Sequence, residues 1–276
     1  MLVIEQYIEA KTGKIEQCED GIAVNEHFIA VIDGVTSKSS FSFQSKSSGR
    51  IAMELIREVI LNMNKEIDAI GTLGEINRHI REWYKDKGLL ESMREKSEER
   101  CGASYVIFSA FRNELWFVGD CQALVNGEAF QPQKQADKIF GDLRALLIHS
   151  ELAQGKTEEE LLQRDTSRER IFDLLKFQTK LQNTSHKSEF SYYIVDGFDW
   201  EPQLGLLVVP VNKPHGEITL ASDGYYRLLP NLKETEALLS ELLRDDPLCY
   251  KQFRSTKGRY SGNVSFDDRC YIRFSY

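Results

Sequence analysis

Acidic residues follow short apolar segments at several widely separated points of the sequence. Three of these segments, "FIAVIDG", "ELWFVGD" and "EITLASDG", contain Asp33, Asp120 and Asp223, each beside a glycine. Asp-Gly pairs are also typical of turns. If the apolar segments are strands, each carboxylate lies at the edge of a sheet, and carboxylates gathered there repel one another unless cations intervene. The pattern is therefore consistent with a cation site or with a set of turns.

Two acidic pairs extend this set toward both ends of the chain. Glu19 and Asp20 precede the apolar segment "GIAV", and Asp267 and Asp268 precede the final apolar segment "CYIRF". A site built from oxygen ligands suits a hard divalent ion such as Mg²⁺ or Mn²⁺ rather than zinc. The five histidines have no paired metal-binding spacing, so we assign them no ligand role.

Strands are predicted around each of these acidic residues. The opening segment 2–8 is one strand, "GIAVNEHFIAVID" is a hairpin that turns at Asn25-Glu26, and "ASYVIFSAFRNELWFVGD" is a second hairpin. Further strands are predicted at "FSYYIV", "LGLLVV", "EITLAS" and "DRCYIRFSY".

Helices are predicted between these groups of strands. Apolar residues recur at helical spacing in "SGRIAMELIREVILNMN", in "EINRHIREWYKDK", in "LLESMREKSEER", between residues 135 and 180, and in "KETEALLSELLRD". Neighbouring strands are joined by short turns, which favours antiparallel sheets with helices on their outer faces. We therefore predict an α+β fold in one domain.

Composition excludes several classes of protein. The chain has 276 residues and a formal net charge of -8, from 43 acidic and 35 basic residues, which argues against nucleic acid as the main partner. The five cysteines are scattered and form no Cys-x-x-Cys pair, so a zinc ribbon or a disulfide framework is not expected. Without a signal peptide or an apolar run long enough to span a membrane, the protein is expected to be cytoplasmic.

Taken in order, the acidic segments resemble the motifs of the metal-dependent serine/threonine protein phosphatases, the type 2C family, in its bacterial form. The family's "ED" before a strand is similar to "CEDGIAV", its "VxDG" to "AVIDG", and its Gly-Ser/Ala-Thr strand followed by "GDS" to "GASYVIFSAFRNELWFVGDC". Its "LASDG" is present as "TLASDG", and its closing Asp-Asn or Asp-Asp is similar to "SFDDRCYIRF". The matches run from Glu19 to Ile272 in the family's order.

This resemblance implies a fold and a domain organisation. Two antiparallel β-sheets would pack as a sandwich with helices on both outer faces, the α-β-β-α arrangement. Residues 1–276 would form a single phosphatase-like domain with a helical insertion near 135–182. The resemblance also implies a metal site. Asp33 would bridge two metal ions, the carbonyl of Gly34 and the side chain of Glu19 would lie on one of them, and Asp20 would lie close by.

The remaining residues of the implied site come from the second half of the sequence. Asp223 and Asp267 would hold the other ion, and Asp120 corresponds to the family's aspartate at a third, weaker ion. The implied cofactors are Mg²⁺ or Mn²⁺. A water bridged by two such ions would attack the phosphorus of phosphoserine or phosphothreonine in a phosphorylated protein substrate, without a covalent enzyme intermediate.

The sequence departs from the family pattern at three points. The family's phosphate-binding arginine precedes its "ED", whereas this chain has "KTGKIEQCED" with Lys14. Lysine binds phosphate as a point charge without a bidentate fork, so Lys14 is either a phosphate contact or a solvated surface residue. Val35 stands where a histidine often follows the Asp-Gly pair, and Asp268 stands where asparagine is commoner.

Three functions are compatible with these residues. An active phosphoprotein phosphatase is favoured because all the expected acidic ligands are present. The alternatives are a phosphatase-like module that binds or senses without catalysis, and a phosphatase of small molecules.

Overall fold

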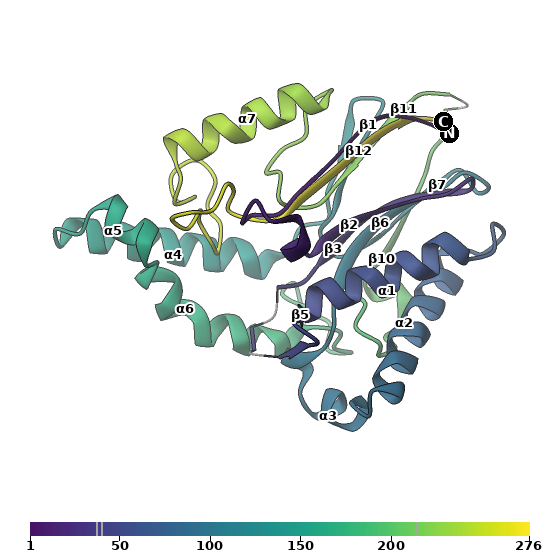
Figure 1. Ribbon diagram of the computed structural model, residues 1–276, viewed down its shortest axis with the longest axis horizontal. Helices are drawn as coiled ribbons and strands as arrows, with labels where there is room; N and C mark the ends of the chain where they lie inside the picture. The colour runs from purple at the N-terminus through teal and green to yellow at the C-terminus, as the bar shows by residue number, and fades with distance from the viewer. Residues whose placement is uncertain (37, 40, 214) are drawn as a thin grey trace.

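Two five-stranded antiparallel β-sheets face each other in the computed structural model, and helices lie against the outer surface of each sheet (Figure 1). The structure describes residues 1–36, 38–39, 41–213 and 215–276. The predicted α+β fold, with two antiparallel sheets and helices outside them, is confirmed. Among the described residues, no helix combines the length and the apolar composition needed to cross a membrane.

The first sheet joins the two ends of the chain. Its strand order is β1-β12-β11-β8-β9. The strands are β1 (Leu2–Glu9), β12 (Arg269–Ser275), β11 (Glu217–Ala221), β8 (Gln122–Val125) and β9 (Glu128–Phe130).

The second sheet contains the two predicted hairpins. Its strand order is β10-β7-β6-β3-β2, and a short ribbon, β4-β5, lies outside both sheets. The strands are β10 (Leu206–Pro210), β7 (Glu114–Val118), β6 (Ala103–Ser109), β3 (Phe28–Gly34), β2 (Asp20–Val24), β4 (Ser42–Phe43) and β5 (Lys46–Ser47).

Seven α-helices and four short 3-10 helices are present among the described residues. Ser47 accepts a hydrogen bond from the first turn of α1, and Asp68 does the same for α2, as N-cap residues commonly do. The helices are α1 (Ser48–Asn62), α2 (Ala69–Asp86), α3 (Leu90–Glu95), η2 (Ser97–Glu99), α4 (Gln135–Ala153), α5 (Glu158–Gln163), α6 (Thr166–Phe177), η3 (Gln178–Leu181), η4 (Pro202–Leu204) and α7 (Leu232–Asp245), with η1 (Ile15–Gln17) near the N-terminus.

Strand β3 shows how the hydrophobic cores are built. Alternate residues of a strand point to opposite faces. Ile29 and Val31 belong to the core between the sheets, whereas Ala30 and Ile32 belong to the core under α1 and α2. Burial on both faces explains why "FIAVI" is continuously apolar rather than alternating. Full burial of each large apolar side chain contributes roughly 1.5–3 kcal/mol.

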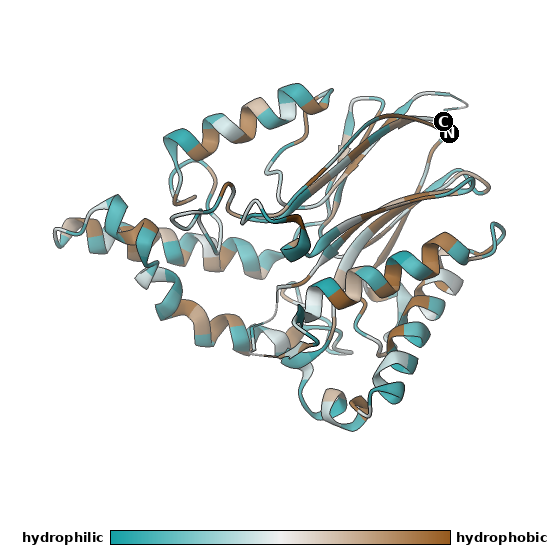
Figure 2. Cartoon of the chain, viewed as in Figure 1, coloured by the Kyte–Doolittle hydropathy of each residue, from teal (hydrophilic) through white to brown (hydrophobic). Residues whose placement is uncertain are grey.

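Helix α7 covers the outer face of the first sheet. Its residues Leu239 and Leu242 pack against Tyr225 and against Tyr271 of β12. Figure 2 shows hydrophobic residues along the strands of both sheets and a mixture of hydrophobic and hydrophilic residues along α1, α2 and α7. This mixture is expected of helices with one face on a sheet and the other in solvent.

Two strand predictions differ from the structure. The segment "FSYYIV" forms no strand, because Tyr192 and Val195 make only isolated bridges, to Gln182 and Ala103. The predicted strand at residues 190–195 is therefore wrong. The hairpin β8–β9 was not predicted, although it turns at Asn126-Gly127, both with positive φ (50° and 88°). Asn-Gly is a strong signal for such a turn.

The helices α4, α5, α6 and η3 occupy the range in which the sequence predicts a helical insertion. In Figure 1, α5 and most of α4 and of α6 lie to the left of the two sheets. Below, residues 246–264, which connect α7 to the acidic pair before β12, are called the 246–264 loop.

Arg144 of α4 holds this loop from inside the protein. Its side chain is fully buried and donates hydrogen bonds of 2.8 and 2.6 Å to one oxygen of Asp165. It also donates to the carbonyl groups of Leu248, Cys249 and Ser255. Arg144 is therefore the link between the helical segment and the 246–264 loop.

Replacing Arg144 with methionine should destabilise the protein by about 3–5 kcal/mol, because it leaves the buried carboxylate of Asp165 without its cation. The exposed pair Arg164–Glu169 offers a matched control, since its side chains are 74% and 51% exposed. Arg164→Met should leave stability nearly unchanged. Chemical denaturation of the two variants and the parent measures the difference, and equal midpoints for both variants would contradict the role given to Arg144.

Candidate metal centre

Asp33 is placed by the pairing of three neighbouring strands in the second sheet. It lies near the end of β3, opposite Asp20 of β2 and Ser104 of β6. The Ser104 hydroxyl donates a hydrogen bond of 2.9 Å to Asp120, which follows β7 closely. The register of the strands therefore brings Asp20, Asp33 and Asp120 to one end of this sheet.

Gly119 allows Asp120 to stay close to β6. Its φ of +82° lies in the left-handed region, and a Cβ there would overlap the side chain of Ser104. Glycine adopts this conformation without steric cost and leaves room for the neighbouring strand. The Gly-Asp order in "VGD" thus has a structural reason as well as a chemical one.

The first sheet supplies the other predicted carboxylates. Strands β11 and β12 pair antiparallel, and Ser222, just beyond β11, is joined to Cys270 of β12 by hydrogen bonds of 3.1 and 3.0 Å. Asp223 therefore leaves its strand beside the start of β12, which Asp267 and Asp268 precede.

Asp33, Asp120 and Asp223 converge from the ends of both sheets. Each offers one carboxylate oxygen, and the three oxygens all lie within 4.8 Å of one another. Together with Gly34 and Asp267, these aspartates line a cleft of about 590 Å³. Oxygen ligands gathered in this way are those that hard divalent cations bind.

Repulsion among these carboxylates is strong. Burial, then the charges of Asp20 and Asp120, raise the pKa of Asp33 well above its ordinary value. Burial and the charges of Asp33 and Asp120 raise the pKa of Asp223 in the same way. Burial and Asp268 raise the pKa of Asp20, whose Oδ2 has no hydrogen-bond partner among the described residues. A cation relieves such repulsion, so the residues present fit a divalent ion.

Glu19 lies next to Gly34, and its carboxylate accepts hydrogen bonds from two hydroxyl groups. Thr36 and Ser47 each donate a hydrogen bond of 2.6 Å, to different oxygens of Glu19. The amide of Gly34 donates to the carbonyl of Glu19 at 3.2 Å, and a Cβ on Gly34 would overlap the backbone of Glu19 and Gly49. The structure thus brings Glu19 and Gly34 together, beside the group of three carboxylates.

Two lysines that the sequence analysis did not identify contact the acids directly. Lys257 forms an ion pair with Asp267. The ammonium of Lys11 lies 3.7 Å from Asp267, 3.3 Å from Asp268 and 3.4 Å from Glu19. Burial alone would raise the pKa of Asp267, but the charges of Lys257 and Lys11 outweigh burial and lower it. Neither lysine has a motif spacing that could have identified it from the sequence.

Lys14, the predicted phosphate contact, lies on the surface. Its side chain is exposed just before η1, and Lys14 is not among the described residues that line the cleft. Lys11, three residues earlier, is the lysine of this segment that reaches the acidic residues.

Further cations line the same cleft. Lys38, Lys134, Arg168 and Arg254 are among its lining residues. Lys134 pairs with Asp137 at 3.1 Å. Burial, then the charges of Lys134 and Arg168, lower the pKa of Lys38 to about 8. Such a wall of positive charge suits an anionic ligand such as a phosphate group.

Comparisons with known proteins return solved structures of low sequence identity. No protein-family model matches the chain, and no curated protein matches its sequence. The chain is similar to the serine/threonine phosphatase PstP/Ppp of Mycobacterium tuberculosis, with 14% identity and a TM-score of 0.49 over 100% of this chain and 98% of that one.

Two further solved structures show a comparable similarity. PppA of Pseudomonas aeruginosa, described as a regulatory component of T6SS, is 13% identical with a TM-score of 0.47, over 99% of this chain and 96% of that one. The serine/threonine phosphatase Stp1 of Staphylococcus aureus is 16% identical with a TM-score of 0.45, over 99% of this chain and 94% of that one.

Proposed function

We propose that the chain is a metal-dependent phosphoprotein phosphatase of the type 2C kind, which hydrolyses phosphoserine or phosphothreonine. The observation that carries the proposal is the convergence of Asp33, Asp120 and Asp223 within 4.8 Å in an open cleft. A cluster of carboxylates with cations in the same cleft can hold both a divalent metal and the phosphate group of a substrate.

The proposed metal ligands come from the ends of strands in both sheets. They are Glu19, Asp20, Asp33, Gly34, Asp120, Asp223 and Asp267, and the proposed cofactors are Mg²⁺ or Mn²⁺. Ions bound there supply an activated water and neutralise phosphate oxygens. Ser104 orients Asp120 by donating to its carboxylate. Asp33 is fixed by the pairing of β3 with β2 and β6, which sets the position of its carboxylate.

The cleft also fits the proposed substrate. Its volume of about 590 Å³ and its lining of Tyr192, Arg168 and Lys38 leave room for a phosphorylated side chain. The net charge of -8 makes nucleic acid an unsuitable partner. We propose a cytoplasmic location, in keeping with the unpaired cysteines, which are all buried.

The alternatives differ from this proposal in a measurable way. A non-catalytic module would bind metal or a phosphorylated ligand without turnover. A small-molecule phosphatase would hydrolyse an aryl phosphate but discriminate against a phosphothreonine peptide. The presence of all the proposed acidic ligands favours the enzyme over the non-catalytic module.

The variant Asp33→Asn tests whether Asp33 is a metal ligand or a structural turn residue. It removes one of the repelling charges at nearly constant volume, so the metal-free variant should melt at or above the temperature of the parent. Mn²⁺ should raise the melting temperature of the parent strongly and that of Asp33→Asn far less, because ligand binding to the folded state stabilises by mass action. Hydrolysis of a phosphothreonine peptide should fall by about 100-fold or more, as expected when charge stabilisation is removed from a reaction centre.

Asp86, exposed at the end of α2, gives the matched control, and Asp86→Asn should behave as the parent does. EDTA should abolish activity in the parent. If Asp33→Asn melts well below the parent in EDTA, Asp33 is a structural residue. Activity that survives chelation or requires zinc would contradict the proposed metal centre.

We also propose Lys14 as a phosphate contact for large substrates. Because its side chain is exposed outside the cleft, it can contact only a substrate that extends onto the surface. Lys14→Ala should raise KM for a phosphorylated protein by about 2- to 5-fold, the effect of one exposed charge pair, with kcat unchanged. KM for an aryl phosphate should not change, and Lys14→Arg should retain the parent values. Equal KM values for the protein substrate in Lys14→Ala and the parent would assign Lys14 to the solvated surface.

A further inference from the structure

We propose that Lys257 is an internal cation that occupies the place of a second divalent ion at Asp267. The inference rests on the proposed metal-dependent function and concerns the regulation of the same site. In this arrangement Asp33, Asp120 and Asp223 would hold one ion, whereas a further ion at Asp267 would first have to displace the ammonium of Lys257. Binding of the further ion is therefore weakened by a competitor within the chain.

The contacts of Lys257 set it apart from the other cations of the cleft. Its ammonium pairs directly with Asp267, which is 7% exposed and lies in the same cleft as Asp33 and Asp223. Lys134 lines the same cleft, but it pairs with Asp137, which is not a proposed metal ligand. Lys257 is thus placed to neutralise a proposed metal ligand.

Lys11 completes a pair of internal positive charges. It reaches Glu19, Asp267 and Asp268 from the opposite end of the chain. Two ammonium groups carry the same charge as one divalent ion. Glu19, Asp267 and Asp268 therefore have a substitute for a divalent cation in the folded protein.

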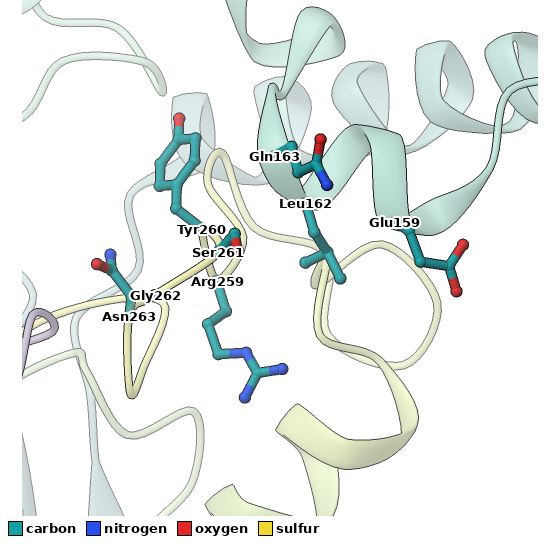
Figure 3. Close-up of a pocket in the computed structure, with 8 residues that line it drawn as sticks. All are labelled: Glu159, Leu162, Gln163, Arg259, Tyr260, Ser261, Gly262 and Asn263. Atoms are coloured by element: carbon teal, nitrogen blue, oxygen red, sulfur yellow. The ribbon is translucent and has the colours of Figure 1, made fainter.

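The 246–264 loop holds Lys257 in position. Arg168 of α6 donates a hydrogen bond to the carbonyl of Thr256, the residue before Lys257. Farther along the loop, the amide of Ser261 donates to the carbonyl of Leu162 at 2.9 Å. Figure 3 shows this part of the loop beside α5, at the border of a pocket of about 330 Å³. These contacts anchor the loop to the helical segment on both sides of Lys257.

The same loop supports the other lysine. The amide of Val264 donates to the carbonyl of Lys11 at 2.9 Å. One loop, anchored to the helices by Arg144 and Arg168, therefore carries Lys257 and contacts the backbone at Lys11. A partner or ligand that moved the helices would therefore also change the position of Lys257 relative to Asp267.

Calorimetric titration with Mn²⁺ tests the competition without measuring activity. The parent should show one tight site and a weaker one, and Lys257→Met should bind the second ion about tenfold more tightly or better, the equivalent of about 1.4 kcal/mol. Lys257→Arg keeps the positive charge and should resemble the parent. Lys251 lies in the same loop but pairs with Glu158 at the surface, so Lys251→Met is the control and should also resemble the parent.

Melting curves give a second readout in case Lys257→Met folds poorly. In EDTA this variant should melt below the parent, because Asp267 loses its nearest cation and, among the described residues, keeps the ammonium of Lys11 at 3.7 Å and the amide of Asp268 at 3.0 Å. Mn²⁺ should then raise its melting temperature more than it raises that of the parent. A Mn²⁺ affinity in Lys257→Met that equals or falls below that of the parent would overturn the proposal.

Failure of this inference is distinguishable from failure of the proposed function. If Lys257→Met gains Mn²⁺ affinity while no variant hydrolyses a phosphopeptide, competition between Lys257 and the metal is supported and the proposed phosphatase function is wrong. If the parent hydrolyses a phosphopeptide but Lys257→Met binds Mn²⁺ as the parent does, only the competition fails. If no variant binds Mn²⁺, both are overturned.

Discussion

Repulsion among half-buried carboxylates at one end of the two sheets is the constraint that the surrounding structure has to satisfy. Asp33, Asp120 and Asp223 lie within 4.8 Å of one another, and burial together with mutual repulsion raises the pKa of Asp33 and of Asp223. Such an arrangement opposes folding unless positive charge or hydrogen-bond donors compensate for it. Hydroxyl groups compensate for the negative charge of Glu19, and ammonium groups compensate for that of Asp267. The repulsion among Asp33, Asp120 and Asp223 would be relieved by a bound cation.

Apolar packing between the two sheets opposes the repulsion among these carboxylates. The core between them includes Val31 and Phe274, so the strands that end at the carboxylates are anchored along their length by apolar packing. The 246–264 loop is fixed from the other side, where Arg144 and Asp165 form a buried pair. The cleft thus lies between a sheet sandwich and a helical segment, and the loop that carries Lys257 touches both.

The sequence predicted the parts of this arrangement that depend on local patterns. Apolar segments ending in Asp33, Asp120 and Asp223 predicted strands whose ends carry carboxylates, and the structure brings these three together. Periodicity failed at "FSYYIV", where aromatic and β-branched residues are buried in a non-strand segment beside η3. The contacts of Lys11 and Lys257 depend on tertiary packing between distant segments, and lysine has no fixed spacing from its partners, so no sequence pattern could have identified them.

Anomalous diffraction from crystals of the Mn²⁺-loaded protein would show where the metal binds without reference to activity. We expect a strong peak among the carboxylates of Asp33, Asp120 and Asp223, where the oxygens already converge. A strong peak elsewhere on the protein, with these three carboxylates in contact only with water or lysine, would contradict the proposed metal centre.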